Sequence, residues 1–225
     1  VSELRVVEGV TLQGRVLLNG RDAARAILRP TTGAATLGES AVVTGQGTVR
    51  GSWTCAGTLA PGSGLDGIGL LQPSVAPFAM TPTARVAIDA GGTADDEYDR
   101  IDGNSGAIIT LDGTLDVNFV DGYVPEPRDQ FEIITASMID GSFASTTIEP
   151  VGAIGPAHVV YTGDSVIVVI CAADRDADGE LTIFDFLAFQ NLFDSGDLRA
   201  DLDQDGQLTI FDFLTYQNRF DAGCG

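Results

Sequence analysis

Two aspartate-rich segments in the last third of the chain hold the side chains best suited to bind a metal ion. Residues 174–185 read DRDADGELTIFD, and residues 201–212 read DLDQDGQLTIFD. Each segment has an acid at positions 1, 3, 5 and 12 and a glycine at position 6. Twelve-residue loops with this spacing enclose calcium in proteins, so the chain is expected to bind two Ca²⁺ ions here.

This spacing, that of the EF-hand loop, follows from how a hard cation is surrounded by oxygen. Ca²⁺ takes about six to eight oxygens, and alternate residues of a tight loop point toward its centre. The glycine permits the sharp reversal. Position 7 offers its main-chain carbonyl, position 9 holds a water, and the acid at position 12 returns from the following helix. The predicted ligands are Asp174, Asp176, Asp178, Glu180, Thr182 and Asp185 in the first loop, and Asp201, Asp203, Asp205, Gln207, Thr209 and Asp212 in the second.

An acidic turn exposed to solvent is the alternative interpretation. Such a turn would not repeat with glycine and hydrophobic residues in register, as these two segments do. Carboxylates within a few ångströms repel one another without a cation, so both loops are expected to be loose when empty. Mg²⁺ fits less well than Ca²⁺, because it demands a smaller octahedral shell and releases water reluctantly.

Each loop leads into a segment with helical spacing of apolar residues. Residues 184–193 read FDFLAFQNLF, and residues 211–220 read FDFLTYQNRF. In the first segment Phe186, Leu187 and Phe189 belong to the stripe of an amphipathic helix that packs on its twin. The Ile-Phe pair where each helix begins is harder to bury completely.

The loops and helices together resemble the dockerin type I module, from Asp174 to about Ala222. The resemblance implies two loop–helix calcium repeats with near two-fold symmetry and a cohesin-like protein partner. In that family, positions 10, 11, 17 and 18 commonly face the partner. The matching residues are Ile183, Phe184, Gln190, Asn191, Ile210, Phe211, Gln217 and Asn218. Familiar dockerins have Ser-Thr at the first pair and Lys-Arg at the second. This chain has neither, so an ordinary cellulosomal cohesin is not the expected partner.

Two of the three cysteines bracket the acidic C-terminal segment. A disulfide between Cys171 and Cys224 would close a loop around a small module, and it would be a covalent version of the terminal clasp of dockerin-like modules. It indicates an oxidising, extracellular or cell-surface location. The alternative is three unrelated buried thiols. Cys55, the odd one, is either buried or paired with another chain.

The charge balance of the chain excludes several classes of partner. The formal net charge is -20, and all twelve basic residues are arginine, so neither nucleic acid nor an anionic membrane is expected to bind. Without lysine, Schiff-base catalysis and lysine isopeptide cross-links are excluded. No apolar run reaches the roughly 18 residues that span a bilayer, so no membrane insertion is expected. The start at Val1 is either a processed terminus or a cut from a longer chain.

Residues 1–170 are predicted to form a β structural domain, which precedes the helical calcium-binding domain at residues 171–225. Short runs with period-two alternation end at Gly, Asp or Asn, as in residues 107–122, AIITLDGTLDVNFVDG. Only residues 21–28, RDAARAIL, have a helical pattern. Frequent G-T and G-x-G steps, small residues at stacking positions and a low aromatic content of 7% favour a right-handed β-solenoid over the alternative β-sandwich.

Two strings in this domain are similar to the terminal passenger-like β-solenoid segments of large bacterial surface and autotransporter-associated proteins. They are residues 57–71, GTLAPGSGLDGIGLL, and residues 97–143, which begin EYDRIDGNSG. In those proteins an A-P-G turn, a Y-D-x-I strand and a G-x-L-x-V strand recur before a closing hairpin. The likeness covers roughly residues 40–170 and implies a surface-exposed scaffold without catalytic residues.

No residues are arranged for a recognisable catalytic reaction. The single histidine, His158, lies in a PAHVV run that is typical of a strand-edge or core position. Asp95, Asp96, Glu97 and Asp99 form a charge run of the kind found in solvated loops. The chain is therefore not expected to be an enzyme.

The sequence thus favours a secreted, non-catalytic, calcium-dependent scaffold or anchoring protein whose tail binds another protein at the cell surface. Two alternatives stay open. One is a self-assembling extracellular fibre or sheath subunit, suggested by the lone Cys55 and by exposed strand edges. The other is a fragment of a polysaccharide-active enzyme or carbohydrate-binding protein, since glycosidases need only two carboxylates.

Overall fold

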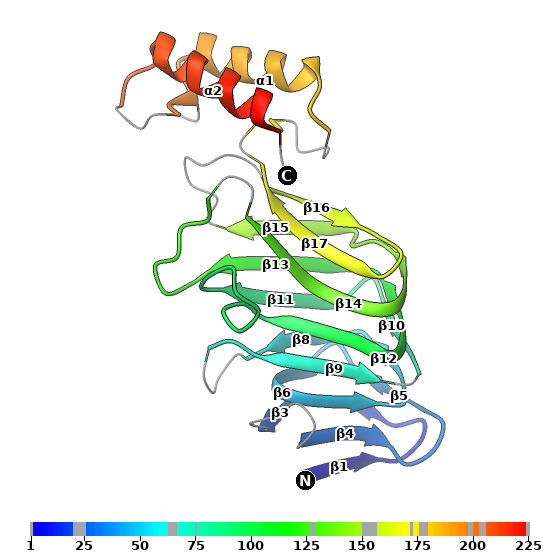
Figure 1. Ribbon diagram of the computed structural model, residues 1–225. Helices are drawn as coiled ribbons and strands as arrows, with labels where there is room; N and C mark the ends of the chain where they lie inside the picture. Colours follow the sequence, from blue (N-terminus) through cyan, green and yellow to red (C-terminus); the bar gives the residue numbers. More distant parts are fainter. Residues whose placement is uncertain are drawn as a thin grey trace. The chain divides into compact units, whose positions relative to one another are not determined.

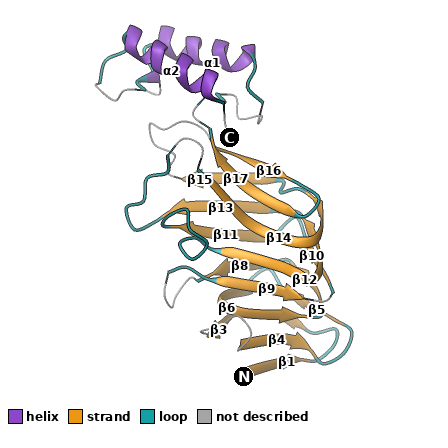
Figure 2. Cartoon of the chain, in the orientation of Figure 1, coloured by secondary structure: helices purple, strands orange, loops and turns teal. Residues whose placement is uncertain are grey.

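The computed structural model describes most of the chain as strands followed by two helices (Figures 1 and 2). The described residues are 2–19, 26–62, 67–74, 76–126, 129–149, 157–171, 173–175, 180–197, 200–202 and 206–223. The chain divides into two compact units. The first comprises residues 1–123, 132–149 and 161–166, and the second comprises residues 124–131, 150–160 and 167–225. The predicted domain boundary between residues 170 and 171 stays a prediction.

The strands are short, and most have residues that alternate between core and surface. They are β1 (Ser2–Val6), β2 (Thr11–Leu12), β3 (Arg15–Asn19), β4 (Ala26–Pro30), β5 (Ala34–Leu37), β6 (Val42–Arg50), β7 (Ser52–Cys55), β8 (Thr58–Pro61), β9 (Leu70–Ser74), β10 (Pro77–Met80), β11 (Arg85–Ala90), β12 (Arg100–Leu111), β13 (Thr114–Phe119), β14 (Gln130–Gly141), β15 (Ser145–Glu149), β16 (Ala157–Tyr161) and β17 (Ser165–Ile170). The helices are α1 (Ile183–Asp194) and α2 (Ile210–Ala222).

The strands form a β-solenoid of about five turns. Three ladders of parallel strands run along it: β1–β4–β6–β9–β12–β14, β2–β5–β7–β10–β12 and β3–β6–β8–β11–β13–β15. The alternative β-sandwich is wrong, because a sandwich is built from antiparallel neighbours. The expected right hand of the coil stays a prediction.

The solenoid core is made of columns in which one residue stacks on its counterpart in the next turn. One column runs from Val16 through Val43, Leu59 and Val86 to Leu115. The last four of these side chains are at most 1% exposed. Parallel in-register pairing therefore converts period-two alternation within each strand into a continuous apolar interior.

Small residues at one corner of each turn permit this close stacking. Thr58 donates its main-chain N–H to Ala41, and Arg85 donates to Gly57 in the turn below. A Cβ added to Gly57 would lie 2.3 Å from the carbonyl oxygen of Ala41, and one added to Gly113 would lie 2.1 Å from that of Ala84. The expectation that small residues occupy stacking positions is thus confirmed at this corner.

The helical prediction for residues 21–28 is wrong for its last three residues, which belong to β4; residues 21–25 lie outside the described part of the chain. β4 pairs with β1 and β6, and Ala26, Ile27 and Leu28 are buried. Burial between two neighbouring turns outweighs the weak local preference of this segment for helix.

Cys55 is buried in the solenoid, at 0% exposure, and is a free thiol. Its thiol lies 3.5 Å from the carbonyl oxygen of Gly57. Burial raises the pKa of the thiol to about 12. Because disulfide exchange needs an accessible thiolate, the folded chain does not offer Cys55 for pairing with another chain.

No helix in the described residues is long and apolar enough to cross a bilayer.

The prediction that Asp99 belongs to a solvated charge run is wrong. Asp95, Asp96 and Glu97 are exposed, but Asp99 is 0% exposed. Its carboxylate accepts main-chain hydrogen bonds from Gly69 at 2.7 Å and from Asp89 at 3.1 Å. Burial raises the pKa of Asp99 to about 8, against the opposing effect of these two bonds. Asp99 therefore fastens the loop that precedes β12 to the neighbouring turn.

Asp99→Asn is expected to destabilise the solenoid by about 1–3 kcal/mol near pH 5, because the new amide NH₂ cannot accept one of the two main-chain bonds. The folded wild-type chain keeps a proton on Asp99 up to about pH 8, whereas the unfolded chain releases it near 3.8. The contribution of Asp99 to the free energy of unfolding therefore falls as pH rises between these values. The cost of Asp99→Asn should therefore shrink by about pH 9. Denaturant titration followed by fluorescence of the buried Trp53 measures both values. Exposed Asp96→Asn serves as the control, and a cost that grows with pH would contradict this account.

Candidate metal site and partner surface

The helical module is held together by aromatic packing between α1 and α2. The rings of Phe189 and Tyr216 are stacked, with centroids 4.2 Å apart and planes 2° apart. Both side chains are 0% exposed, and they occupy equivalent positions in the two repeats. Phe186 and Phe213 meet edge to face beside them, with centroids 5.5 Å apart. The expected packing of the two amphipathic helices on one another is therefore present.

Each helix begins with the same hydrogen-bonded cap. Thr182 is the N-cap of α1 and accepts a bond from the N–H of Phe184 at 3.1 Å, and Thr209 does the same for Phe211 at 3.2 Å. At position 9 these threonines were expected to hold a water in the metal shell. Their hydroxyl oxygens cap the helices, as Ser and Thr commonly do at this position, and the water in the metal shell stays a prediction.

The aspartate at position 12 of each loop joins the helix to the start of the loop. Asp185 accepts from the N–H of Thr182 and from that of Arg175, each at 2.7 Å. Asp212 accepts from the N–H of Thr209 at 2.8 Å and from that of Leu202 at 2.7 Å. Both carboxylates are 0% exposed. The two carboxylates thus hold oxygen atoms, the type of ligand that a hard cation prefers, at the junction of loop and helix.

The aspartates at position 1 are also buried. Asp174 is 0% exposed and Asp201 is 8% exposed. In the second loop, one carboxylate oxygen of Asp201 accepts from the N–H of Gly206 at 2.8 Å. Its other oxygen, Oδ1, is buried and has no hydrogen-bond partner in the described residues. A buried, ionised oxygen is costly unless a positive group compensates it. The donor set at positions 1 and 12 thus suits a hard cation.

The remaining predicted ligands do not complete a site within the described residues. Glu180 and Gln207 are exposed, which is compatible with a main-chain role at position 7. The acids at positions 3 and 5 lie outside the described part of the chain; they are Asp176, Asp178, Asp203 and Asp205. Among the residues that are described, no group of three or more His, Cys, Asp or Glu side chains is placed to hold a metal. The full ligand sets therefore stay a prediction.

The first loop has contacts that the second lacks. His158 of β16 is buried, as expected for a core histidine, and its Nδ1 lies 3.0 Å from Oδ2 of Asp174. The guanidinium of Arg175 lies 5.8 Å from the centre of the Phe189 ring and 6.0 Å from that of Tyr216. The equivalent of Arg175 in the second loop is Leu202, which is buried. Nothing in the sequence signals the contact between His158 and Asp174.

The predicted partner residues are exposed in both repeats. Ile183 and Phe184 are 62% and 65% exposed, and Ile210 and Phe211 are 62% and 63% exposed. The four polar members, Gln190, Asn191, Gln217 and Asn218, are exposed as well.

Leu187 and its equivalent Leu214 extend this exposed surface, at 46% and 47% exposure. The expectation that Leu187 packs in the core between the helices is wrong. The signal was present in the sequence, because Leu187 lies four residues after Ile183 and therefore on the same side of the helix. We call Ile183, Phe184 and Leu187 the first apolar patch, and Ile210, Phe211 and Leu214 the second.

The predicted bridge between Cys171 and Cys224 stays a prediction, since Cys224 lies outside the described residues. Cys171 is buried in the core of the helical module, together with Ala173, Phe189 and Tyr216. Its position is therefore compatible with a structural cysteine.

Tyr216→Phe is expected to lower the stability of the helical module by about 1–2 kcal/mol. The hydroxyl of Tyr216 donates to the carbonyl oxygen of Ala173 at 3.1 Å in a buried position, and phenylalanine would leave that oxygen without this donor while keeping the stack on Phe189. Thermal unfolding followed by circular dichroism of the helices measures the loss. Thr215→Val, at a half-buried neighbouring position of α2, is the control. An unchanged melting temperature would show that this hydrogen bond contributes no stability.

No protein-family model matches the chain, and no curated protein matches it significantly. The function is therefore argued from the residues themselves.

Proposed function

We propose that the chain is a secreted, non-catalytic scaffold or anchoring protein whose dockerin-like C-terminal module binds two Ca²⁺ ions and attaches to a protein partner. The observation that carries this proposal is a duplicated one. In each repeat, buried aspartates stand at positions 1 and 12 of a loop, and an exposed apolar patch begins with the Ile-Phe pair at positions 10 and 11. The solenoid then serves as the body that the module anchors.

The buried charge supports a cation in each loop. Asp174, Asp185, Asp201 and Asp212 are all buried within one small module. Oxygen ligands in a twelve-residue loop favour Ca²⁺ among the common cations, and the ion would neutralise the carboxylates when bound. Oδ1 of Asp201, buried without a hydrogen-bond partner among the described residues, is the atom that most needs such an ion.

The connection between loop and helix supports calcium dependence of the partner surface. Asp185 fastens the loop at Arg175 to the helix at Thr182, and Ile183 is the next residue. Asp212 makes the equivalent bonds to the N–H groups of Leu202 and Thr209, and Ile210 follows Thr209, so each patch begins directly after a helix N-cap that its loop aspartate holds. An ion that orders the loop therefore also orders the turn that presents the patch.

The chemistry of the patches supports a protein partner. Isoleucine, phenylalanine and leucine in one exposed cluster are the residues that fill apolar pockets at interfaces. The neighbouring Gln190, Asn191, Gln217 and Asn218 are uncharged and provide a polar rim. A cohesin-like receptor with an apolar contact surface fits better than one that selects basic side chains, since the second pair of partner positions holds no Lys or Arg.

An extracellular or cell-surface location follows from the same chemistry. Extracellular calcium is abundant enough to fill loops of modest affinity. The predicted bridge between Cys171 and Cys224 would also form only in an oxidising compartment. In the described residues no specific observation favours a polysaccharide-active enzyme, a carbohydrate-binding protein or a fibre joined through Cys55, so none of these is proposed.

Isothermal titration calorimetry of the wild-type chain is expected to find two Ca²⁺ ions per chain. Asp201→Asn removes the charge at position 1 of the second loop and should weaken that site by at least about tenfold, leaving one ion. Asp174→Asn should do the same for the first loop. Asp194→Asn, at an exposed acid near the end of α1, is the matched control and should keep both ions. Wild-type protein that binds no calcium, or Asp201→Asn protein that still binds two ions equally well, would refute the metal assignment.

Replacing Ile183 and Ile210 by aspartate together is expected to abolish attachment while leaving both calcium sites intact. A charge at the centre of each apolar patch should weaken binding by about 2 kcal/mol or more per patch that contacts the partner. The measurement is retention of cell-surface proteins by the immobilised full chain, in calcium and again in chelator, with the captured proteins identified by mass spectrometry.

The control for that experiment is the double variant Val7→Asp and Val124→Asp. These valines are 65% and 67% exposed, close to the exposure of the two isoleucines, and they lie outside the helices. The control should bind as the wild type does. A partner retained equally in calcium and in chelator, or retained by the double isoleucine variant, would contradict the proposed attachment.

A further inference from the structure

The buried histidine of strand β16 lies beside the first predicted calcium loop. Nδ1 of His158 is 3.0 Å from Oδ2 of Asp174, and the two side chains are 7% and 1% exposed. Nδ1 has no aligned hydrogen-bond partner among the described residues, although this carboxylate oxygen is within hydrogen-bond distance. A buried polar atom is costly unless it is paired, and the carboxylate of Asp174 is the group that the fold brings to it.

The path of the chain places β16 next to this loop. A tight turn joins β16 to β17 (Figure 1), and in it Thr162 donates its main-chain N–H to the carbonyl oxygen of Ser165 at 2.9 Å. The first loop begins shortly after β17, where the main-chain N–H of Asp174 donates to the carbonyl oxygen of Cys171 at 3.3 Å. His158 and Asp174 both belong to the second compact unit of the chain. Strand and loop are therefore parts of one unit.

The chemistry of the two groups defines which of them donates. Asp174 would be ionised as a ligand of Ca²⁺, and an ionised carboxylate only accepts hydrogen bonds. An imidazole nitrogen that faces this carboxylate must therefore carry a hydrogen, which makes Nδ1 of His158 the donor. Carboxylates that bind a metal ion are commonly held in place by such a bond from a neighbouring group.

The second loop has no equivalent of this histidine in the part of the chain that the structure describes. Asp201, at position 1 of that loop, has one buried oxygen without a hydrogen-bond partner among the described residues. Its other oxygen accepts from the main-chain N–H of Gly206, which is a bond within the loop itself. His158 is the only histidine of the chain, so no other imidazole can hold Asp201 in the same way. The two loops therefore differ in what positions their first ligand.

We propose that His158 is a positioning residue of the first calcium loop: it holds the carboxylate of Asp174 by a hydrogen bond from Nδ1 and thereby raises the calcium affinity of this loop alone. This inference rests on the proposed function, because it requires that the first loop binds Ca²⁺. His158 itself would not bind the ion, since this hard cation takes oxygen ligands. A carboxylate that is held before the ion arrives loses less conformational freedom on binding.

Calorimetric calcium titrations of full chains with a single remaining site test this role. The Asp201→Asn chain reports on the first site, and the Asp174→Asn chain reports on the second. His158→Phe removes the donor but keeps a ring, so in the Asp201→Asn chain it should weaken calcium binding by about tenfold or more. In the Asp174→Asn chain, the same substitution should leave the calcium affinity unchanged.

The conservative variant His158→Asn separates the donated hydrogen bond from the packing of the ring. The amide nitrogen of asparagine stands near the place of Nδ1 and can donate to the same carboxylate oxygen. In the Asp201→Asn chain, His158→Asn should therefore keep most of the calcium affinity that His158→Phe loses.

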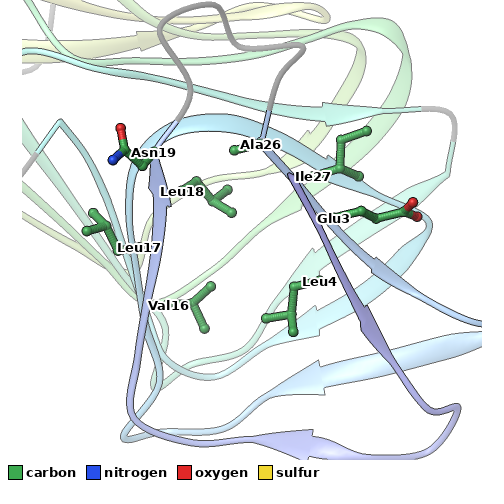
Figure 3. A pocket seen from close by; sticks show the side chains of 8 residues that line it. All are labelled: Glu3, Leu4, Val16, Leu17, Leu18, Asn19, Ala26 and Ile27. Carbon is green, nitrogen blue, oxygen red and sulfur yellow. The ribbon is translucent and has the colours of Figure 1, made fainter. Parts of the chain in front are cut away.

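Leu18→Ala is the control for a general loss of stability. Leu18 is buried beside a cavity lined by residues of β1, β3 and β4 (Figure 3), in the first compact unit of the chain. Its truncation should lower the melting temperature of the solenoid. It should leave the calcium affinity of both loops unchanged.

The single histidine also gives a spectroscopic measurement that needs no substitution at His158. Nitrogen NMR of the isotope-labelled imidazole in the wild-type chain should show a hydrogen on Nδ1 in chelator. Addition of calcium should shift this signal in the wild-type chain and in the Asp201→Asn chain. It should not shift the signal in the Asp174→Asn chain, where only the second loop keeps its ligands.

The outcomes separate this inference from the proposed function. An Asp201→Asn chain that binds no calcium would refute the first calcium site, and the role of His158 with it. An Asp201→Asn chain that binds calcium equally well with and without His158→Phe would overturn the role of His158 and leave the proposed function standing. The same holds for an Nδ1 without hydrogen, for His158→Asn protein that binds as weakly as His158→Phe protein, and for an equal loss of affinity at the second site.

Discussion

The burial of four aspartates in a small helical module is the constraint on which the proposed function depends. Asp174, Asp185, Asp201 and Asp212 hold carboxylates away from water at the places where loop and helix join. Main-chain N–H groups satisfy part of each carboxylate, but a hydrogen bond does not neutralise a charge. A divalent ion in the loop would neutralise them, in the segment that fixes the first turn of the helix. In the proposed function, ion binding, helix capping and presentation of the patch would therefore depend on the same loop aspartates.

The helix starts and the acidic loop positions could be predicted from sequence because they are local. Loop position, cap and helix lie within about twelve residues of one another, and the 27-residue repeat shows the pattern twice. Thr182 and Thr209 were identified as site residues, although their hydroxyls cap the helices. Leu187 was misplaced because its neighbours Phe186 and Phe189 belong to the core stripe. The boundary between the exposed and buried sides of α1 lies between Phe186 and Leu187. Because both residues are apolar, their chemical character does not show which of them is exposed.

Contacts that depend on the coil as a whole could not be predicted in this way. The solenoid class followed from small residues and glycine steps, which the corner at Gly57 and Gly113 explains. The strand at Ala26 and the burial of Asp99 did not follow, because each depends on a neighbouring turn that is distant in sequence. His158 and Asp174 likewise meet only through the fold. The sequence around Asp99 does not show whether another turn of the solenoid covers this residue.

The two apolar patches would share one control in the proposed function. Each begins one residue after a threonine N-cap, and the aspartate at position 12 joins that cap to the start of the loop. Removal of a bound ion would leave the buried aspartates uncompensated and would loosen both caps together. One chain carries two such patches, so a partner with two sites would bind the second at a raised effective concentration once the first is bound. Modest affinity at each patch would then suffice for firm anchoring, and removal of calcium would release both.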